Sequence, residues 1–284
     1  MLVFLNGCFV PEEQAVVSVF DRGLLYGDGL FETLRIMNGV PLSWDAHWRR
    51  FALGLLRLDL TVRWAPEFLR ANAGDLCHRN HLPDALLRLA ISRGVGRRGY
   101  SPRGADAPTL VMSLHSAPVL EATAPRWKLH TASLRVPVGD WLSGCKTSSK
   151  LLHVLARAEA EAAGADEALL LNSRGEVVEA TSANVFWIEA DGLHTPPLDS
   201  GALPGVTRAA VLAWCRTQGI AVHETSADLA RLAGADGAFL TMSSWGVVEV
   251  AALDGRAVPI SPLTQRVRTA LLAAWAVDGN CGAA

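Results

Sequence analysis

Lysine is nearly absent from this sequence. Of the 26 lysines and arginines among its 284 residues, only three are lysines: Lys128, Lys146 and Lys150. Arginine therefore supplies almost all of the positive charge, and lysine does not serve as generic surface charge. A lysine amine that is neutral near pH 7 can form a Schiff base with a carbonyl group, which a guanidinium cannot do. Lys146 and Lys150 lie four residues apart, so either both are exposed charges at a helix start or one carries chemistry.

The sequence also lacks paired cysteines. Its five cysteines are an odd number, are widely spread and contain no Cys-x-x-Cys pair. This pattern argues against a disulfide framework and a zinc site, and it favours a reducing compartment. The eight histidines lack the spacing of metal ligands, so we expect no bound metal. The cysteines are Cys8, Cys77, Cys145, Cys215 and Cys281.

Strong net charge and long apolar runs are absent as well. The formal net charge of -2 gives no reason to expect nucleic acid or an anionic membrane surface as a partner. No apolar run is long enough to span a membrane, and the first residues lack the basic and hydrophobic regions of a signal peptide. Hydrophobic residues make up 50% of the chain and charged residues 19%, which provides a substantial core. We therefore expect a soluble, cytoplasmic protein with a small-molecule partner.

Strand and helix patterns alternate irregularly along the chain, which is typical of an α+β or mixed α/β protein. Strands are expected at 1–5, 8–10, 15–20, 30–37, 40–42, 85–93, 109–115, 127–134, 165–171, 177–188, 237–242 and 247–251. Helices are expected at 43–58 and 66–78, from a cap at Ser148 or Ser149 through 162, from 203–207 to about 217–219, at 227–232 and from about 263. The stretch 21–29 holds three glycines and predicts a tight loop. The stretch 117–126 lacks periodicity and predicts a linker between domains 1–116 and 127–284.

The stretch Gly94–Gly99 matches the pattern Gly-x-Gly-x-x-Gly and follows an expected strand. A dinucleotide site also needs a helix that begins at this point. The residues that follow include Pro102 and cannot continue a helix. We therefore expect a glycine-bent loop that presents Arg97, Arg98 and Tyr100, whose guanidinium and phenol groups suit a carboxylate-bearing ligand. A solvated basic loop is the alternative.

Two further stretches have the features of an anion site. Gly205, Val206 and Thr207 open an expected helix, where the first helical amides and a hydroxyl group can bind an anion. Ser243 and Ser244 follow an expected strand and offer hydroxyl groups that could complete a phosphate site. An ordinary capped helix is the alternative interpretation of the first stretch.

Glu179 lies within otherwise apolar strand sequence. A carboxylate is costly to bury there unless a cationic group meets it, and the alternative is a solvent-facing position on the strand. A reactive lysine, a phosphate site and a buried acid are together what pyridoxal 5'-phosphate requires, because the acid keeps the pyridine nitrogen protonated. The sequence therefore favours pyridoxal phosphate as cofactor.

These residues resemble the motifs of the class IV aminotransferase superfamily, the fold-type IV pyridoxal-phosphate enzymes. The resemblance covers nearly the whole chain and rests on several motifs together. They are Asp21–Gly23, Tyr26–Thr33, His47–Phe51, Lys146 followed five residues later by Leu151, Glu179 with Asn184, and Pro204–Thr207. The resemblance implies a two-domain fold, with a small α/β domain and a larger pseudobarrel-like domain that binds the cofactor. It also implies a homodimer.

The resemblance further implies roles for individual residues. Lys146 would be the Schiff-base lysine and the catalytic residue, and Lys150 would occupy a variable helical position. Glu179 would contact the pyridine nitrogen. The phosphate would be held by Arg50, Gly205, Val206, Thr207, Ser243 and Ser244. The substrate would be bound by Thr33, Arg97, Arg98 and Tyr100. Glu249 departs from the pattern, because the superfamily usually has proline at this position.

Within the superfamily the sequence is most similar to the aminodeoxychorismate lyases. Ile91–Ser101 resembles the loop of these lyases, and 165–171 and 182–187 are similar as well. Branched-chain aminotransferases usually have Glu-Gly-Ile-Arg where this chain has Glu32–Arg35, and D-amino-acid aminotransferases have arginine and histidine in place of Arg98 and Tyr100. The resemblance thus implies a lyase that converts 4-amino-4-deoxychorismate to 4-aminobenzoate and pyruvate in folate biosynthesis. The alternatives are a branched-chain or D-amino-acid aminotransferase and a non-catalytic cofactor-binding protein.

Overall fold

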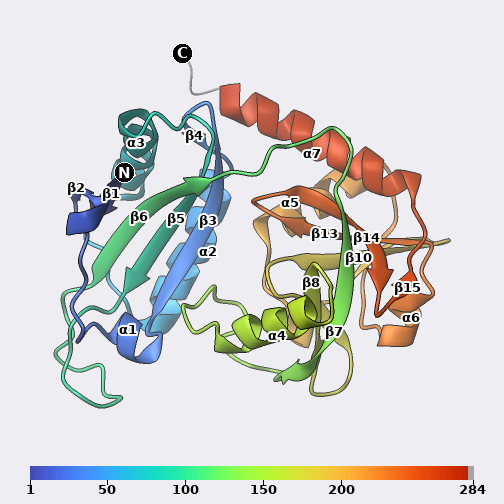
Figure 1. Ribbon diagram of the computed structural model, residues 1–284, viewed down its shortest axis with the longest axis horizontal. Coiled ribbons are helices and arrows are strands. Elements are labelled where there is room, and N and C mark those ends of the chain that lie inside the picture. Colours follow the sequence, from blue (N-terminus) through green and yellow to red (C-terminus); the bar gives the residue numbers. More distant parts are fainter. Residues whose placement is uncertain (281–284) are drawn as a thin grey trace. The chain divides into compact units, whose positions relative to one another are not determined.

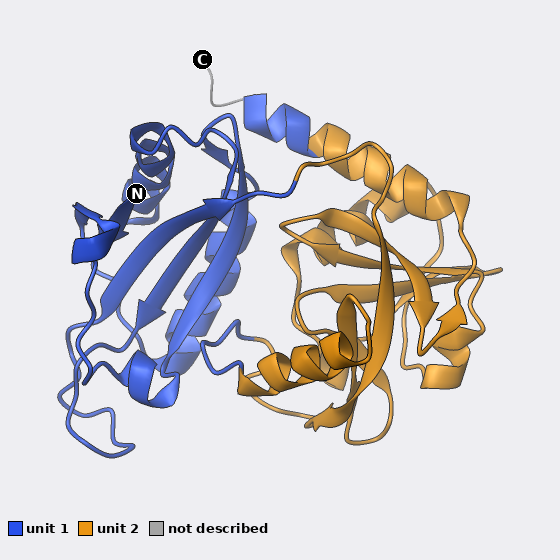
Figure 2. Cartoon of the chain, in the orientation of Figure 1, with its two compact units in different colours: residues 1–118, 145–150, 275–284 blue, residues 119–144, 151–274 orange. Residues whose placement is uncertain are grey.

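The computed structural model describes residues 1–280 of the chain (Figure 1). These residues form two compact units, which Figure 2 shows in different colours. Unit 1 comprises 1–118, 145–150 and 275–280 of the described residues, and unit 2 comprises 119–144 and 151–274. Cys281 lies outside the described residues, and the other four cysteines are free thiols. No helix among the described residues is both long enough and apolar enough to cross a membrane.

Unit 1 is built on a six-stranded antiparallel sheet with the strand order β2-β1-β6-β5-β3-β4. The strands are β1 (Leu2–Leu5), β2 (Cys8–Pro11), β3 (Gly29–Met37), β4 (Val40–Pro41), β5 (Ala85–Ser92) and β6 (Thr109–Ser116). Helices α2 (Trp44–Leu58) and α3 (Pro66–Arg79) share a core with one face of this sheet. That face is apolar because alternate strand residues, such as Leu87 and Leu89, are buried.

Unit 2 is built on a nine-stranded mixed sheet with the order β12-β11-β10-β13-β14-β7-β8-β9, and β15 pairs with β14. The pairs β7/β8, β7/β14 and β11/β12 are parallel. The strands are β7 (Arg126–Val136), β8 (Glu167–Asn172), β9 (Val177–Ala180), β10 (Asn184–Glu189), β11 (Gly192–Thr195), β12 (Val222–Glu224), β13 (Gly237–Met242), β14 (Gly246–Leu253) and β15 (Arg256–Ala257). The helices are α4 (Leu151–Ala162), α5 (Val206–Thr217), α6 (Leu229–Ala233) and α7 (Pro262–Asn280), whose last residues belong to unit 1.

Most expected elements are present with slightly shifted ends, but the strand expected at 15–20 is wrong. No strand forms there, and Val16 and Phe20 are exposed. Residues that favour strands do so by packing on a pleated, half-buried surface, and this segment has no such neighbours. The expected strand 177–188 is likewise two strands, β9 and β10, separated by residues 181–183.

The stretch 21–29, expected to be a loop, contains the short helix α1 (Arg22–Tyr26). The side chain of Asp21 accepts a hydrogen bond from the amide of Gly23 at 2.7 Å and so caps the helix start. Gly27 ends the helix with a φ of 67°, a left-handed conformation that glycine adopts without strain. The aspartate and glycines that suggested a loop are therefore the two caps of one helical turn.

Two segments of the expected domain 127–284 belong to unit 1. The amide of Phe31 donates to the carbonyl oxygen of Lys146 at 2.9 Å, and the amide of Ser148 donates to Gly29 at 2.9 Å, so 146–148 run along the start of β3. Near the chain's end, Asp278 accepts a hydrogen bond from the amide of Ser43 at 2.8 Å. Both segments belong to unit 1 because of contacts between residues that are far apart in sequence. The boundary between 118 and 119 falls within the expected linker 117–126.

Candidate functional site

Lys146 is held against the first residues of β3. Its backbone pairs with Phe31, and its Nζ lies 4.8 Å from the centroid of the Phe31 ring. The residue is partly buried, so its amine contacts an aromatic face instead of standing fully in water. Lys150 precedes the first residue of α4, so the helical position expected for it is wrong.

Glu32 of β3 is a buried acid that faces α2. Arg50 donates from Nε to Oε1 at 2.8 Å and from Nη2 to Oε2 at 2.6 Å, and Nδ1 of His47 lies 2.8 Å from Oε2. Burial raises the pKa of Glu32, but the hydrogen bonds and charges of Arg50 and His47 outweigh it and bring this pKa to about 2. Arg50, a predicted phosphate residue, is therefore fixed on α2 with two of its nitrogens directed at Glu32.

The loop expected to bind a carboxylate exposes the side chains of Arg97, Arg98 and Tyr100. No helix follows the loop, as the sequence predicted. The guanidinium of Arg22 in α1 donates hydrogen bonds to its backbone, so other residues of unit 1 restrain its conformation. Thr33, the fourth predicted substrate residue, lies on β3 and is partly buried.

Arg88 of β5 is a candidate site residue that sequence reasoning missed. It pairs in register with Thr33, and its guanidinium lies 3.8 Å from the centroid of the Phe31 ring. Within residues 1–280, no hydrogen bond or ion pair reaches this guanidinium. Burial lowers the pKa of Arg88, because the charged form has lost part of its hydration. A guanidinium in this state suits a ligand carboxylate. In the sequence, the feature that could have indicated Arg88 is a lone arginine in the otherwise apolar stretch 85–91.

Glu179 of β9 is partly buried in unit 2, and an amide group and a side-chain amide donate hydrogen bonds to its carboxylate. Oε2 accepts a hydrogen bond from the amide of Leu203 at 2.9 Å and one from Nδ2 of Asn184 at 3.3 Å. Nδ2 of Asn184 also donates to the carbonyl oxygen of Leu203 at 2.8 Å. The three residues form one connected group, so the orientation of the Glu179 carboxylate is fixed.

Helix α5 begins next to this group. Gly205 is its N-cap residue and no side chain caps it, so its first amides lack the usual internal acceptor. A Cβ atom at residue 205 would lie 1.9 Å from Oδ1 of Asn184, so only glycine lets the helix start this close to Asn184. Thr207 is buried in the first turn. The predicted anion site and Glu179 are therefore joined through Asn184.

A hydroxyl group on β13 adds to this part of unit 2. Thr241 pairs in register with Asn184 on β10, and its Oγ1 is buried with no hydrogen-bond partner within the described residues. A buried polar atom in this condition can be satisfied by a ligand. Ser243 and Ser244 follow in the turn between β13 and β14 and are partly buried.

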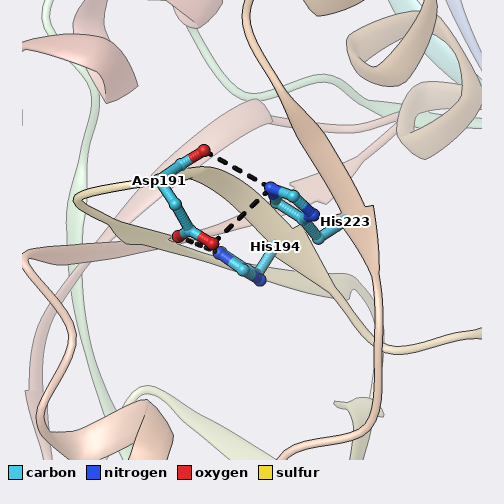
Figure 3. Close-up of side chains that lie close together, drawn as sticks. All are labelled: Asp191, His194 and His223. Carbon is cyan, nitrogen blue, oxygen red and sulfur yellow. Dashed lines mark hydrogen bonds and ion pairs between the residues drawn. The ribbon is translucent and has the colours of Figure 1, made fainter.

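Figure 3 shows another cluster of unit 2, in which two imidazoles point at one carboxylate. Nε2 of His194 lies 2.9 Å from Oδ1 of Asp191, and Nε2 of His223 lies 3.7 Å from Oδ2. Sequence spacing did not reveal this set of possible metal ligands, because pairing of β11 with β12 brings the histidines together. Nη2 of Arg231 lies 3.4 Å from Nδ1 of His194, so a guanidinium group that can only donate occupies the side of the ring opposite Asp191. Both ring nitrogens of His194 therefore lie next to protein groups, and we interpret the cluster as a polar side-chain network.

Comparison with known proteins shows the family of the chain. The family described as amino-transferase class IV matches residues 29–253. A protein of Methanocaldococcus jannaschii, provisionally named a branched-chain-amino-acid aminotransferase, is 36% identical over 259 residues, which are 91% of this chain and 90% of that protein. An aminodeoxychorismate lyase of Vibrio harveyi is 30% identical over 262 residues, which are 90% of this chain and 95% of the lyase.

A solved structure is similar over nearly the whole chain. The T.th. branched-chain amino acid aminotransferase with pyridoxamine 5'-phosphate has a TM-score of 0.89 and 28% identity, and the match covers 97% of this chain and 94% of that one. The expected mixed α/β, fold-type IV architecture is confirmed by this likeness, and pyridoxal phosphate is the cofactor of the family. The chain belongs to the class IV amino-transferase family.

Proposed function

We propose that this chain is a pyridoxal-phosphate-dependent lyase that converts 4-amino-4-deoxychorismate to 4-aminobenzoate and pyruvate. The observation that carries the proposal is the supply of guanidinium groups for two substrate carboxylates in unit 1. Arg88 lies desolvated beside Phe31, and Arg97 and Arg98 stand exposed on their loop. The similarity to the Vibrio harveyi lyase supports the same reaction.

The residues of unit 2 fit the cofactor. Bound pyridoxal phosphate supplies an electron sink for the pair left when a proton leaves the carbon next to the substrate nitrogen. Glu179, held by Asn184 and the amide of Leu203, can accept a hydrogen bond from the pyridine nitrogen and keep it protonated. The uncapped start of α5 and the unsatisfied hydroxyl of Thr241 offer donors to a phosphate. Arg50, Gly205, Val206, Thr207, Ser243 and Ser244 stay predictions for the phosphate.

Lys146 is the proposed base. The substrate amine would replace the Lys146 amine on the cofactor. The freed Lys146 amine would then take the proton from C4 of the substrate. The electron pair of the C4–H bond becomes the new C3–C4 double bond, and the C3–O bond breaks. The ring becomes aromatic, and the departing enolpyruvate takes up a proton and becomes pyruvate. The contact between Nζ and Phe31 restrains Lys146 for this transfer.

Transamination of branched-chain or D-amino acids is the second candidate. The 36% identity to the Methanocaldococcus jannaschii protein favours it. Lys146 and Glu179 would have the same roles, and only the residues that bind the rest of the substrate would differ. The two reactions are therefore separated by their products and not by the cofactor site.

A product assay tests the proposal. The holoenzyme is incubated with 4-amino-4-deoxychorismate, and we expect equimolar 4-aminobenzoate and pyruvate. Parallel incubations with L-leucine and D-alanine, followed by the absorption spectrum of the cofactor, detect transamination as conversion to the amine form. Absence of product above a no-enzyme control would sink the lyase proposal.

The lysine pair provides a matched test of catalysis. Lys146→Ala is expected to lower kcat by at least about a thousandfold, because it removes both the covalent attachment and the base. Lys150→Ala removes a neighbouring amine that has no role in the proposed reaction, so kcat is expected to stay within about twofold of wild type. Equal activity in both variants would contradict the role of Lys146.

We also propose that the chain works as a homodimer in the cytoplasm. Val16, Val19, Phe20 and Leu24 are between 64% and 76% exposed, and exposed apolar surface of this kind is typical of interaction sites. The free thiols agree with a reducing compartment. Light scattering should give twice the chain mass, and Phe20→Glu should shift the protein toward the monomer. A monomeric wild-type protein would overturn the dimer.

A further inference from the structure

One arginine side chain holds the backbone of the loop 97–101. Nη1 of Arg22 donates to the carbonyl oxygens of Gly99 at 2.9 Å and Ser101 at 3.2 Å, and Nη2 donates to that of Tyr100 at 3.0 Å. Nε donates to Oδ2 of Asp28 at 2.8 Å. The Arg22 side chain is only 4% exposed, so these bonds are protected from water. Three consecutive carbonyl groups therefore share one buried guanidinium.

The same short helix contributes a second restraint on the loop. The hydroxyl oxygen of Tyr26 accepts a hydrogen bond from the amide of Gly99 at 3.0 Å, and its ring packs edge-on against Tyr100 with centroids 5.6 Å apart. Gly96 gives the Arg22 stem its room, because a Cβ atom there would lie 2.9 Å from Cδ of Arg22. Helix α1 thus binds the loop at consecutive backbone groups.

The other end of this arrangement is fixed to α2. Oδ2 of Asp28 also accepts a hydrogen bond from Nε of Arg93 at 2.8 Å. Nη2 and Nη1 of Arg93 donate to the carbonyl oxygens of Leu58 at 2.7 Å and Asp59 at 3.1 Å. Burial raises the pKa of Asp28, but the hydrogen bonds from Arg93 and Arg22 outweigh it and leave this pKa below its usual value. The carboxylate therefore stays charged and keeps Arg22 in place.

We propose that Arg22 is a positioning residue for substrate binding, which sets how Arg97, Arg98 and Tyr100 are presented to a substrate carboxylate. This inference rests on the proposed function, because it takes the loop to be part of the substrate site. Holding the loop in one conformation before binding removes the entropy cost of ordering it on the substrate. A planar guanidinium can bind three carbonyls and a carboxylate at fixed angles, whereas an ammonium on a flexible stem cannot.

The test uses the holoenzyme of the variant Arg22→Lys. The substitution keeps the charge beside Asp28 and removes the planar guanidinium donors. Arg79→Lys is the matched control, because Arg79 is 49% exposed and pairs with Asp75 on the surface of α3. For Arg22→Lys we expect a KM about tenfold higher, a kcat within about twofold of wild type, and faster hydrogen exchange confined to 95–104. The cofactor spectrum should not change, and the control should match wild type in all measurements.

Two results would overturn the inference. One is faster exchange with an unchanged KM, which would make Arg22 a purely structural residue. The other is unchanged exchange in 95–104. If Arg22→Lys does not fold, Tyr26→Phe removes only the acceptor for the Gly99 amide, and KM should rise about threefold with the same exchange pattern. A wild-type enzyme that turns over none of the proposed substrates would defeat the proposed function, while the exchange comparison would still show whether Arg22 orders the loop.

Discussion

Arg22 and Arg88 lie in the same unit and are both shielded from water, yet their surroundings differ. Asp28 and three carbonyl groups satisfy Arg22, so the protein itself uses its charge and its donors. Within the described chain, the guanidinium of Arg88 lies over the ring of Phe31 and takes part in no hydrogen bond or ion pair. We infer from this difference that a shielded arginine is structural when groups of the protein accept hydrogen bonds from all its nitrogens, and a candidate ligand site when they do not.

The largest expected effect is on stability, from Arg22→Ala. This change leaves three carbonyl groups without their donor and removes one of the two guanidinium groups that bind Asp28, so the free energy of unfolding should fall by about 3–5 kcal/mol. Denaturant unfolding of the holoenzyme measures it. Arg79→Ala, at an exposed pair, should lower the same quantity by less than about 1 kcal/mol. Losses of equal size would remove the distinction between buried and exposed arginine pairs.

Arg50 is similar to Arg22 in one respect, because two of its nitrogens donate hydrogen bonds to a buried acid, Glu32. The pKa of Glu32 in the folded protein, about 2, lies below the ordinary 4.5, so its contribution to stability is present above pH 4.5 and is lost as the pH falls toward 2. The loss should be on the order of 3 kcal/mol. The unfolding free energy of wild type should therefore fall by that much more than that of Glu32→Gln between pH 5 and pH 2. If the unfolding free energies of wild type and Glu32→Gln change in parallel with pH, the pKa of Glu32 is not lowered in the folded protein.

Arg88→Gln tests the other side of the comparison. It should lower kcat/KM for a carboxylate substrate by about a hundredfold, the effect of a lost charge-assisted pair, through a higher KM. The free energy of unfolding should fall by no more than about 1 kcal/mol, because the change removes the contact with the Phe31 ring but no hydrogen bond or ion pair of the described residues. Arg88→Lys keeps the charge but loses the paired N–H donors of the guanidinium. Its kcat/KM should lie between those of wild type and Arg88→Gln. Unchanged kinetics with a large loss of stability would make Arg88 a structural residue.

The smallest effect is expected in the cluster of Figure 3. This cluster tests whether side chains that only contact one another are wrongly interpreted as a metal site. His223 stacks on His194 at 4.6 Å between centroids and is 40% exposed, so His223→Ala should lower the free energy of unfolding by less than about 1 kcal/mol. Added Zn²⁺ should leave the melting temperature of wild type unchanged. Saturable stabilisation by Zn²⁺ that His223→Ala abolishes would show a metal site instead.

The sequence predicted what its local patterns encode. The strands of unit 1 and the helix that begins at Val206 could be identified from residue type and spacing. The roles of Lys146 and Glu179 are implied by the family resemblance and stay predictions. The short helix at 22–26 could not, because its caps use the same residues as a tight turn. The valine-rich stretch 15–20 has the composition of a strand but no neighbour to pair with.

Other features depend on contacts that no local pattern shows. Arg88 became a candidate only when the structure showed that no acid faces it within residues 1–280. The hydrogen bonds that Asn184 and the amide of Leu203 donate to Glu179 likewise join residues that are separated along the chain. The histidine cluster needed the register of β11 and β12.

The identity of the reactive lysine is tested most directly by reducing the holoenzyme with borohydride, which fixes pyridoxal phosphate to the lysine that binds it. Peptide mass spectrometry then locates the label among Lys128, Lys146 and Lys150. We expect the reduced cofactor on Lys146 alone. A label on Lys150 or Lys128, or no label on any lysine, would contradict it.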